Sequence, residues 1–129
     1  MDIEKPLYAL ADIRIRGLLH LLRDDVRLHV FVERELGALL SYDQRDQADL
    51  VRVLQTSLKH GGNKSTAAHE LGMSRRTLYE RLKRIAVIVG CNLSSVESCL
   101  SLHVALIALG SQRDRQHREH ETRVLSLAT

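Results

Sequence analysis

Aromatic residues, proline and cysteine are all scarce in this chain of 129 residues. Aromatics make up only 3% of it and Pro6 is the one proline, whereas leucine, alanine, arginine and glutamate are frequent. Strands favour β-branched and aromatic residues, and helices favour these four, so the composition predicts an all-α fold. The length leaves room for one domain with a modest core.

The two cysteines, Cys91 and Cys99, are too few for a disulfide framework or a cysteine-rich zinc site. We expect them to be reduced, buried thiols. No uninterrupted apolar run reaches the roughly 18 residues of a membrane span, and the start, MDIEKPLYAL, lacks the basic flank of a signal peptide. These absences predict a cytoplasmic protein with no membrane contact.

Residues that could carry catalysis or hold a metal form no constellation along the sequence. His117 and His120 stand three apart in HREHE, which differs from the His-Glu-x-x-His pattern of zinc proteases, and no cysteine or further ligand is close. Ser57 lies in no nucleophile motif, and Cys91 has no activating neighbour. We therefore expect no enzyme, no metal and no cofactor.

Hydrophobic periodicity predicts five to six helices within one domain, residues 7–110. Residues 1–6 are predicted to be a flexible lead-in, and the polar tail, 111–129, to be disordered or a frayed helix. The alternating IRIR could be a short strand, but it has no partner strand nearby. The predicted helices cover residues 7–22, from Asp24 or Asp25 to about Leu40, from about Asp46 to His60, and 64–71. The recognition helix is predicted over residues 75–85, with a stop signal at Gly90, and the last helix from Ser95, with a Ser94–Glu97 capping box, to a stop at Gly110.

Positive charge is concentrated in one segment of the chain. Residues 59–84 contain seven lysines and arginines but only Glu70 and Glu80 as acids, which gives this segment a net charge of +5. The whole chain carries only +3, so the remainder is −2. A cluster of this kind is typical of a surface that binds nucleic acid.

The corner within that segment has the spacing of a helix-turn-helix. Asn63 can cap the short helix KSTAAHEL, Gly72 permits the positive φ of a reversal, and Ser74 can cap RRTLYERLKRI. Ala68, four residues before the glycine, lets the two helices cross closely, and Leu78, six after it, faces the first helix. This geometry predicts that the second helix enters the major groove of DNA with its N-terminal end first.

Nine polar residues around the corner have a predicted role in DNA binding. Arg75 and Arg76 lie in the first helical turn, where arginine can read guanine O6 and N7. Arg81, Lys83 and Arg84 are placed for phosphates, as is Lys64 on the first helix. Hydroxyl groups of Ser74, Thr77 and Tyr79 can add contacts, although Tyr79 could equally pack at the edge of the core. The alternative for the basic residues is a merely solvated helix face.

The segment NKSTAAHELGMSRRTLYERLKRI, followed by GCNL and LSLHVALIAL, resembles the C-terminal helix-turn-helix domain of PucR-type transcription regulators of purine and sugar-diacid catabolism. It is also similar to Fis-type and NtrC-type DNA-binding domains. Ser74 stands where the family has His and Glu80 where it has Tyr, which concerns base preference rather than fold. The resemblance spans about Leu7 to Leu109, and the matching residues are Arg75, Thr77, Leu78, Arg81, Leu82, Ile85, Gly90, Leu93, Leu102, Ala105 and Leu106.

The resemblance implies a homeodomain-like or Fis-like helix-turn-helix that binds double-stranded DNA and regulates transcription. Because one such motif buries little surface, we expect a homodimer on a two-fold site. The leucines from Leu18 to Leu40 could form the dimer surface or simply cover the core. The alternative function is a helical protein–protein interaction or dimerisation module that keeps the fold without binding DNA. No small-molecule site is visible in the sequence.

Overall fold

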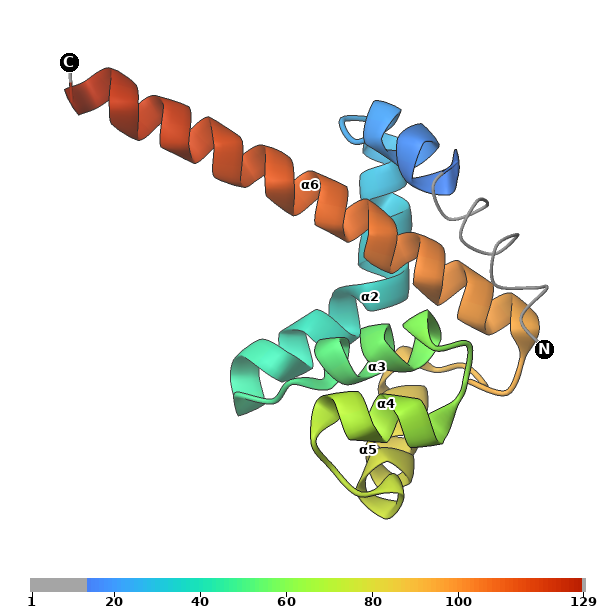
Figure 1. Ribbon diagram of the computed structural model, residues 1–129. Helices are drawn as coiled ribbons and strands as arrows, with labels where there is room; N and C mark the ends of the chain where they lie inside the picture. The colour runs from blue at the N-terminus through green and yellow to red at the C-terminus, as the bar shows by residue number, and fades with distance from the viewer. Residues whose placement is uncertain (1–13, 129) are drawn as a thin grey trace. The chain divides into compact units, whose positions relative to one another are not determined.

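The computed structural model describes residues 14–128, except for the side chains of residues 115–117 and 128. It is all-α, as the composition predicts, and no strand occurs in the described range. The predicted lead-in, residues 1–6, and the predicted helix start at Leu7 lie outside the described residues, as does the side chain of His117. Residues 14–21 are helical and are followed by α2 (Val26–Asp46), α3 (Leu50–Lys59), α4 (Lys64–Leu71), α5 (Arg75–Val89) and α6 (Val96–Ala128) (Figure 1).

The chain divides into two compact units. The first comprises the described residues up to Val32 together with those from Val104 on, and the second is Glu33–His103. The second unit contains α3, α4 and α5 in full, so the predicted helix-turn-helix lies within one unit. The predicted domain limits at residues 6 and 110 remain predictions.

Helices α3, α4 and α5, hereafter the three-helix segment, pack against one another in all three pairs, and Figure 1 shows them close together. Leu54, Leu78 and Ile85 are at most 1% exposed. Ala67 and Ala68 are also buried, and their small side chains let α4 approach its neighbours closely. Removal of this apolar surface from water is the main force that holds the segment together. The other buried apolar residues of the second unit are Leu36, Leu39, Leu50, Val53 and Leu102.

Helical spacing in the sequence predicts that Leu50, Val51, Leu54 and Leu58 form the inward stripe of α3, and the observed buried face is rotated slightly from it. The buried residues are Leu50, Val53, Leu54, Thr56 and Ser57, and the apolar ones among them follow helical spacing. Val53 was not among the predicted inward residues because α3 has more apolar positions than one face can hold. Val51 and Leu58 are only half-buried, and so are Leu71 and Leu82, which the same spacing predicts to face inward on the next two helices.

The corner between α2 and α3 differs from the prediction. Helix α2 continues through the polar stretch SYDQRD to Asp46, so the predicted end at Leu40 is wrong. Asp46 does not cap α3; instead Asp43 accepts hydrogen bonds from the backbone N–H groups of Leu50 and Val51, both at 2.9 Å. A carboxylate that lies seven residues upstream satisfies two of the amides left open at a helix start.

Two predicted limits of the last helix are also wrong. It begins at Val96, and Ser95, not Ser94, caps it by accepting a hydrogen bond from the Ser98 N–H at 3.3 Å. It does not stop at Gly110 but continues to Ala128. Glycine costs about 1 kcal/mol relative to alanine inside a helix, which is too little to end one that is flanked by good helix formers. Residues 118–127 of this extension are all exposed.

In the first unit, the leucines near the N-terminus separate into two environments. Leu19 and Val32 are buried, and so are Leu106 and Ile107 of α6. Three apolar side chains are instead more than half exposed: Leu18 at 56%, Leu21 at 79% and Val26 at 74%. The leucine-rich stretch therefore has both buried and exposed apolar side chains.

The cysteines are free but half-buried rather than fully buried. The Cys99 thiol donates to the carbonyl oxygen of Leu93 at 3.0 Å, and partial burial raises its pKa. Among the described helices, none combines the length and the apolar character needed to cross a bilayer.

Candidate nucleic-acid interface

The corner between α4 and α5 has a defined hydrogen-bond arrangement. Asn63 Oδ1 accepts from the Thr66 N–H at 3.2 Å, so the predicted cap of α4 is confirmed. Gly72 has φ 67° and ψ 33°, and it ends α4 in the left-handed conformation. Two backbone bonds close the turn, from Met73 N–H to Ala68 O and from Gly72 N–H to His69 O. This pairing is a Schellman motif, which glycine favours because it has no Cβ.

Helix α5 begins at the predicted residue. Ser74 Oγ accepts from the Thr77 N–H at 3.1 Å and lies 3.0 Å from the Thr77 hydroxyl. The Ser74 side chain is thus part of the helix cap, which limits the contacts that it can make elsewhere. The helix continues past Ile85, the predicted end of the recognition helix, to Val89, and Gly90, the predicted stop signal, ends it with φ 73°.

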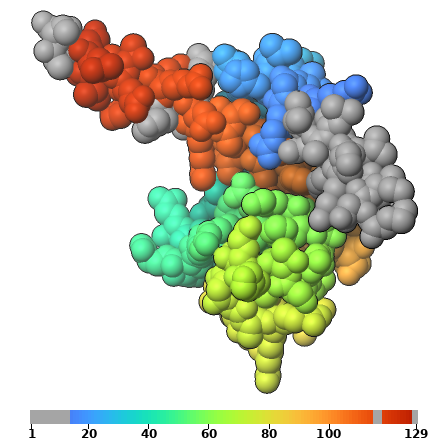
Figure 2. All heavy atoms as spheres, viewed as in Figure 1, coloured from blue at the N-terminus to red at the C-terminus, as the bar shows by residue number. Residues whose placement is uncertain are grey.

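The basic residues of α5 lie away from its buried stripe. Leu78 and Ile85 point into the core and are 0% exposed. At 3.6 residues per turn, the opposite side of the helix carries residues 76, 80, 83 and 87 in one row. We call this row, Arg76, Glu80, Lys83 and Val87, the outward stripe; all four side chains are exposed. In Figure 2, side chains coloured for the start of α5 project outward from the surface.

The other predicted residues flank this stripe. Arg75, in the first turn, lies toward the Tyr79 side, whereas Arg81 and Arg84 lie on the other side. All three guanidinium-bearing residues are exposed. Within the described part of the chain, Arg75, Arg81 and Lys83 have no ion-pair partner, so their charges are available to an anionic ligand.

One of the cations in the outward stripe is paired. Arg76 Nε lies 3.6 Å from Glu80 Oε1, and the two side chains are 90% and 67% exposed. Exposed pairs at this spacing contribute only about 0.3–0.5 kcal/mol because water screens them and both side chains lose freedom. The pair can therefore open when a stronger partner arrives.

Two further cations contact tyrosines. The Lys64 ammonium lies 5.2 Å from the centroid of the Tyr79 ring, which connects α4 to α5. Tyr79 is 49% exposed, so it is neither a core residue nor fully solvated. Arg84 Nη1 donates to the Tyr42 hydroxyl at 2.9 Å, which connects α5 to the end of α2. An exposed cation–π contact is worth about 0.5–1 kcal/mol, so it does not immobilise Lys64.

The nine predicted residues lie on α4, on α5 or at the cap of α5, and three further side chains lie on or beside the same surface: Glu80, Val87 and Tyr42. Glu80 could have been found from its spacing of four from Arg76, because residues at i and i+4 adjoin on a helix. Val87 lies seven residues after Glu80, on the same stripe. Tyr42 had no local signal, since 42 residues separate it from Arg84.

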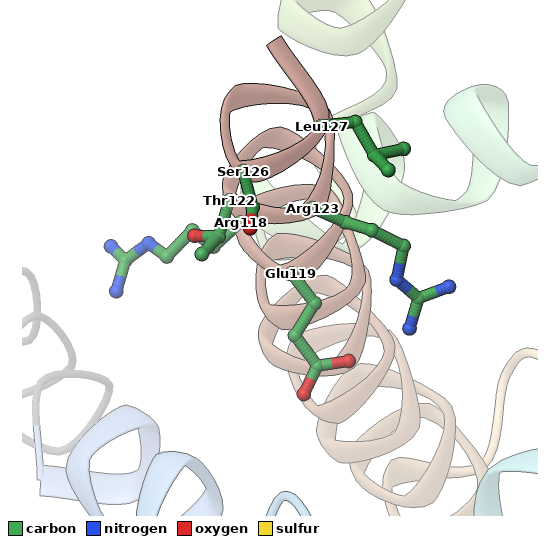
Figure 3. Close-up of a pocket in the computed structure, with 6 residues that line it drawn as sticks. All are labelled: Arg118, Glu119, Thr122, Arg123, Ser126 and Leu127. Atoms are coloured by element: carbon green, nitrogen blue, oxygen red, sulfur yellow. The ribbon is translucent and has the colours of Figure 1, made fainter. Parts of the chain in front are cut away.

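A separate hollow lies along the distal part of α6. Figure 3 shows its lining side chains projecting from successive turns of that single helix. Groups from one straight face diverge into solvent, so this arrangement does not converge on a reacting atom. The lining residues are Arg118, Glu119, Thr122, Arg123, Ser126 and Leu127.

Comparison with known proteins identifies the segment that contains the corner. Residues 50–108 match the family model of the PucR C-terminal helix-turn-helix domain. The match begins at the first residue of α3 and includes all of α4 and α5. It confirms the resemblance to the PucR-type helix-turn-helix domain over residues 50–108, and the likeness expected upstream of Leu50 stays a prediction. No curated protein and no solved structure matches the chain.

Proposed function

We propose, from a chain whose residues 50–108 match a PucR C-terminal helix-turn-helix domain, that this protein is a sequence-specific transcription regulator that docks α5 in the major groove of DNA. The observation that carries the proposal is the exposure of the cations on α5. Arg75, Arg81 and Lys83 extend from a helix whose opposite side is buried in a rigid core. DNA phosphates would supply the ion-pair partners that these three side chains do not have within the described residues.

The two ends of α5 would make different kinds of contact. Arg75 and Arg76 lie in its first turn, nearest to the base edges when a recognition helix enters the groove end-on. Lys83 and Arg84 lie two turns later and would contact phosphates, together with Arg81 and, from α4, Lys64. Ser74, Thr77 and Tyr79 would add hydroxyl contacts, with Ser74 limited by its role as cap.

Binding is proposed to involve a homodimer in the cytoplasm. A single helix-turn-helix module buries less surface than a specific site needs, and two copies on a two-fold site solve this problem. The exposed apolar side chains Leu18, Leu21 and Val26 are candidates for the dimer surface. The same side chains favour the alternative function, a helical interaction module that uses the fold without DNA.

A gel shift with random-sequence DNA at low and high salt separates the two functions. A DNA-binding protein shows affinity that falls steeply as salt rises, because counterions are released from the phosphates. An interaction module shows no such binding at either salt concentration.

Two substitutions test the proposed geometry on a site selected from a random pool. Arg76→Ala should cost about 1–3 kcal/mol on the selected site and relax base preference. Lys83→Ala should weaken binding to all sequences and reduce the salt slope by about one. Arg34→Ala, which removes an exposed charge from α2, serves as the control and should change neither quantity. Normal binding by both α5 variants would refute the docking.

A further inference from the structure

The outward stripe contains one residue of the wrong sign for a DNA-binding surface. Glu80 is the only acidic residue on α5, and its side chain is 67% exposed between Arg76 and Lys83. A carboxylate that faces DNA repels phosphates, so its presence lowers non-specific affinity. Such a residue is understandable if it gains something from the bases.

Only two groups in the major groove can donate a hydrogen bond to a carboxylate: cytosine N4 and adenine N6. Cytosine suits a carboxylate better, because the adenine edge also presents the N7 acceptor, which prefers a side chain with a donor of its own. Guanine and thymine present acceptors there and would repel Glu80.

The partner of Glu80 strengthens this argument. Arg76 lies one turn earlier, 3.6 Å from the carboxylate in the free protein. Four residues of helix rise about 6 Å, which is close to two base steps of about 3.4 Å each. The two side chains can therefore separate and contact bases within about two base pairs of each other. Arginine donates to guanine O6 and N7 in this setting.

We infer that Glu80 is a specificity-determining residue that accepts a hydrogen bond from cytosine N4, while Arg76 reads a guanine within about two base pairs. In the free protein the two side chains neutralise each other; on DNA each exchanges its partner for a base. The inference rests on the proposed function and names the bases that the same surface selects.

The test compares sites selected from a random DNA pool by the full chain and by its variants. The wild-type protein should select a cytosine and a guanine within about two base pairs. Glu80→Gln should shift the cytosine position to adenine, because glutamine can pair with both N6 and N7 of adenine. Discrimination at that position should change by about 5- to 150-fold, the equivalent of one good side-chain–base pair. Glu80→Ala should lose preference there and bind random DNA more tightly than the wild type.

Glu97→Gln is the matched control, since it removes the same charge from an exposed position in the first turn of α6. It should leave base preference unchanged at every position. Circular dichroism should show all variants folded, because neither glutamate is buried.

Three outcomes decide the matter. Unchanged base preference in both Glu80 variants, with DNA binding retained, overturns the role of Glu80 and leaves the proposed function standing. Selection of adenine by the wild type at the position affected by these variants overturns the assignment to cytosine. A wild-type protein that binds no DNA overturns the proposed function itself, and the inference with it.

Discussion

Helix α5 and the distal part of α6 are both regular helices, yet they differ in how much tertiary packing stabilises them. Helix α5 begins at a side-chain cap, ends at a left-handed glycine and buries Leu78 and Ile85 against α3 and α4. Beyond Gly110, α6 runs on with exposed side chains at residues 118–127. Apolar packing stabilises the first helix, whereas residues 118–127 of the second bury no apolar stripe. Helix length is therefore no measure of how firmly a segment is held.

The largest expected difference between these two regions comes from deleting a leucine side chain. Leu78→Ala should lower the free energy of unfolding by about 2–5 kcal/mol, because it opens a cavity among three helices. Leu127→Ala, at a side chain that is 83% exposed, should change it by less than about 0.5 kcal/mol. Urea denaturation measures both values. Similar losses of unfolding free energy in the two variants would show that α5 and the distal part of α6 do not differ in packing as described.

Glycine substitutions should act with opposite signs in the two regions. Gly72→Ala forces a side chain into φ 67° and should destabilise by about 1–2 kcal/mol, although nothing lies near the new Cβ. Gly110→Ala, inside the long helix and with equally open space around it, should stabilise by about 0.5–1 kcal/mol. Thermal unfolding of both variants checks the signs, and a stabilising Gly72→Ala would contradict the role given to the turn.

The cap of α5 should have a smaller effect. Ser74→Ala removes the acceptor for the Thr77 N–H and should cost about 1 kcal/mol. Ser74→Asn keeps an acceptor at the same place and should restore most of that loss. Urea midpoints of the two variants provide the measurement. If asparagine fails to rescue, the contribution of Ser74 lies elsewhere.

The smallest effect concerns an exposed ion pair within the three-helix segment. Glu70 accepts from His60 Nε2 at 3.2 Å and from Lys59 Nζ at 3.4 Å; these bonds, the one from His60 above all, lower its pKa below the usual 4.5. A lowered pKa in the folded state means that the stabilisation is complete above about pH 4.5 and is lost as pH falls through the folded-state pKa. Glu70→Gln should flatten the dependence of the urea midpoint on pH in that acidic range. If the urea midpoint of the wild type depends on pH as little as that of the variant, the interaction of Glu70 with His60 and Lys59 does not contribute to stability.

Much of the three-helix segment was predictable because its signals are local. Asn63, Gly72, Ser74 and Gly90 each act on backbone groups a few residues away, and all four occupy the predicted positions. The same holds for the cations of α5, whose exposure follows from the position of Leu78. Helical periodicity and capping preferences suffice for such residues.

The contacts and helix limits that the sequence did not predict have a different physical origin. Asp43 caps α3 from the preceding helix, and Arg84 contacts Tyr42 across 42 residues. No local sequence pattern predicts either contact, because the two partners lie in different helices. The predicted end of α6 at Gly110 was wrong for another reason. A single glycine ends a helix when the chain leaves it in the left-handed conformation, which Gly110 does not adopt.

The carboxylate of Asp43 has a consequence for how this part of the chain folds. Its two bonds to Leu50 and Val51 form only when residues 47–49, in which Gln47 takes φ 53°, have closed the loop between α2 and α3. The last turn of α2 and the first turn of α3 should therefore acquire their structure in a single kinetic step. Amide hydrogens at positions 50 and 51 should then exchange with deuterium together, when the loop opens, instead of fraying one after another.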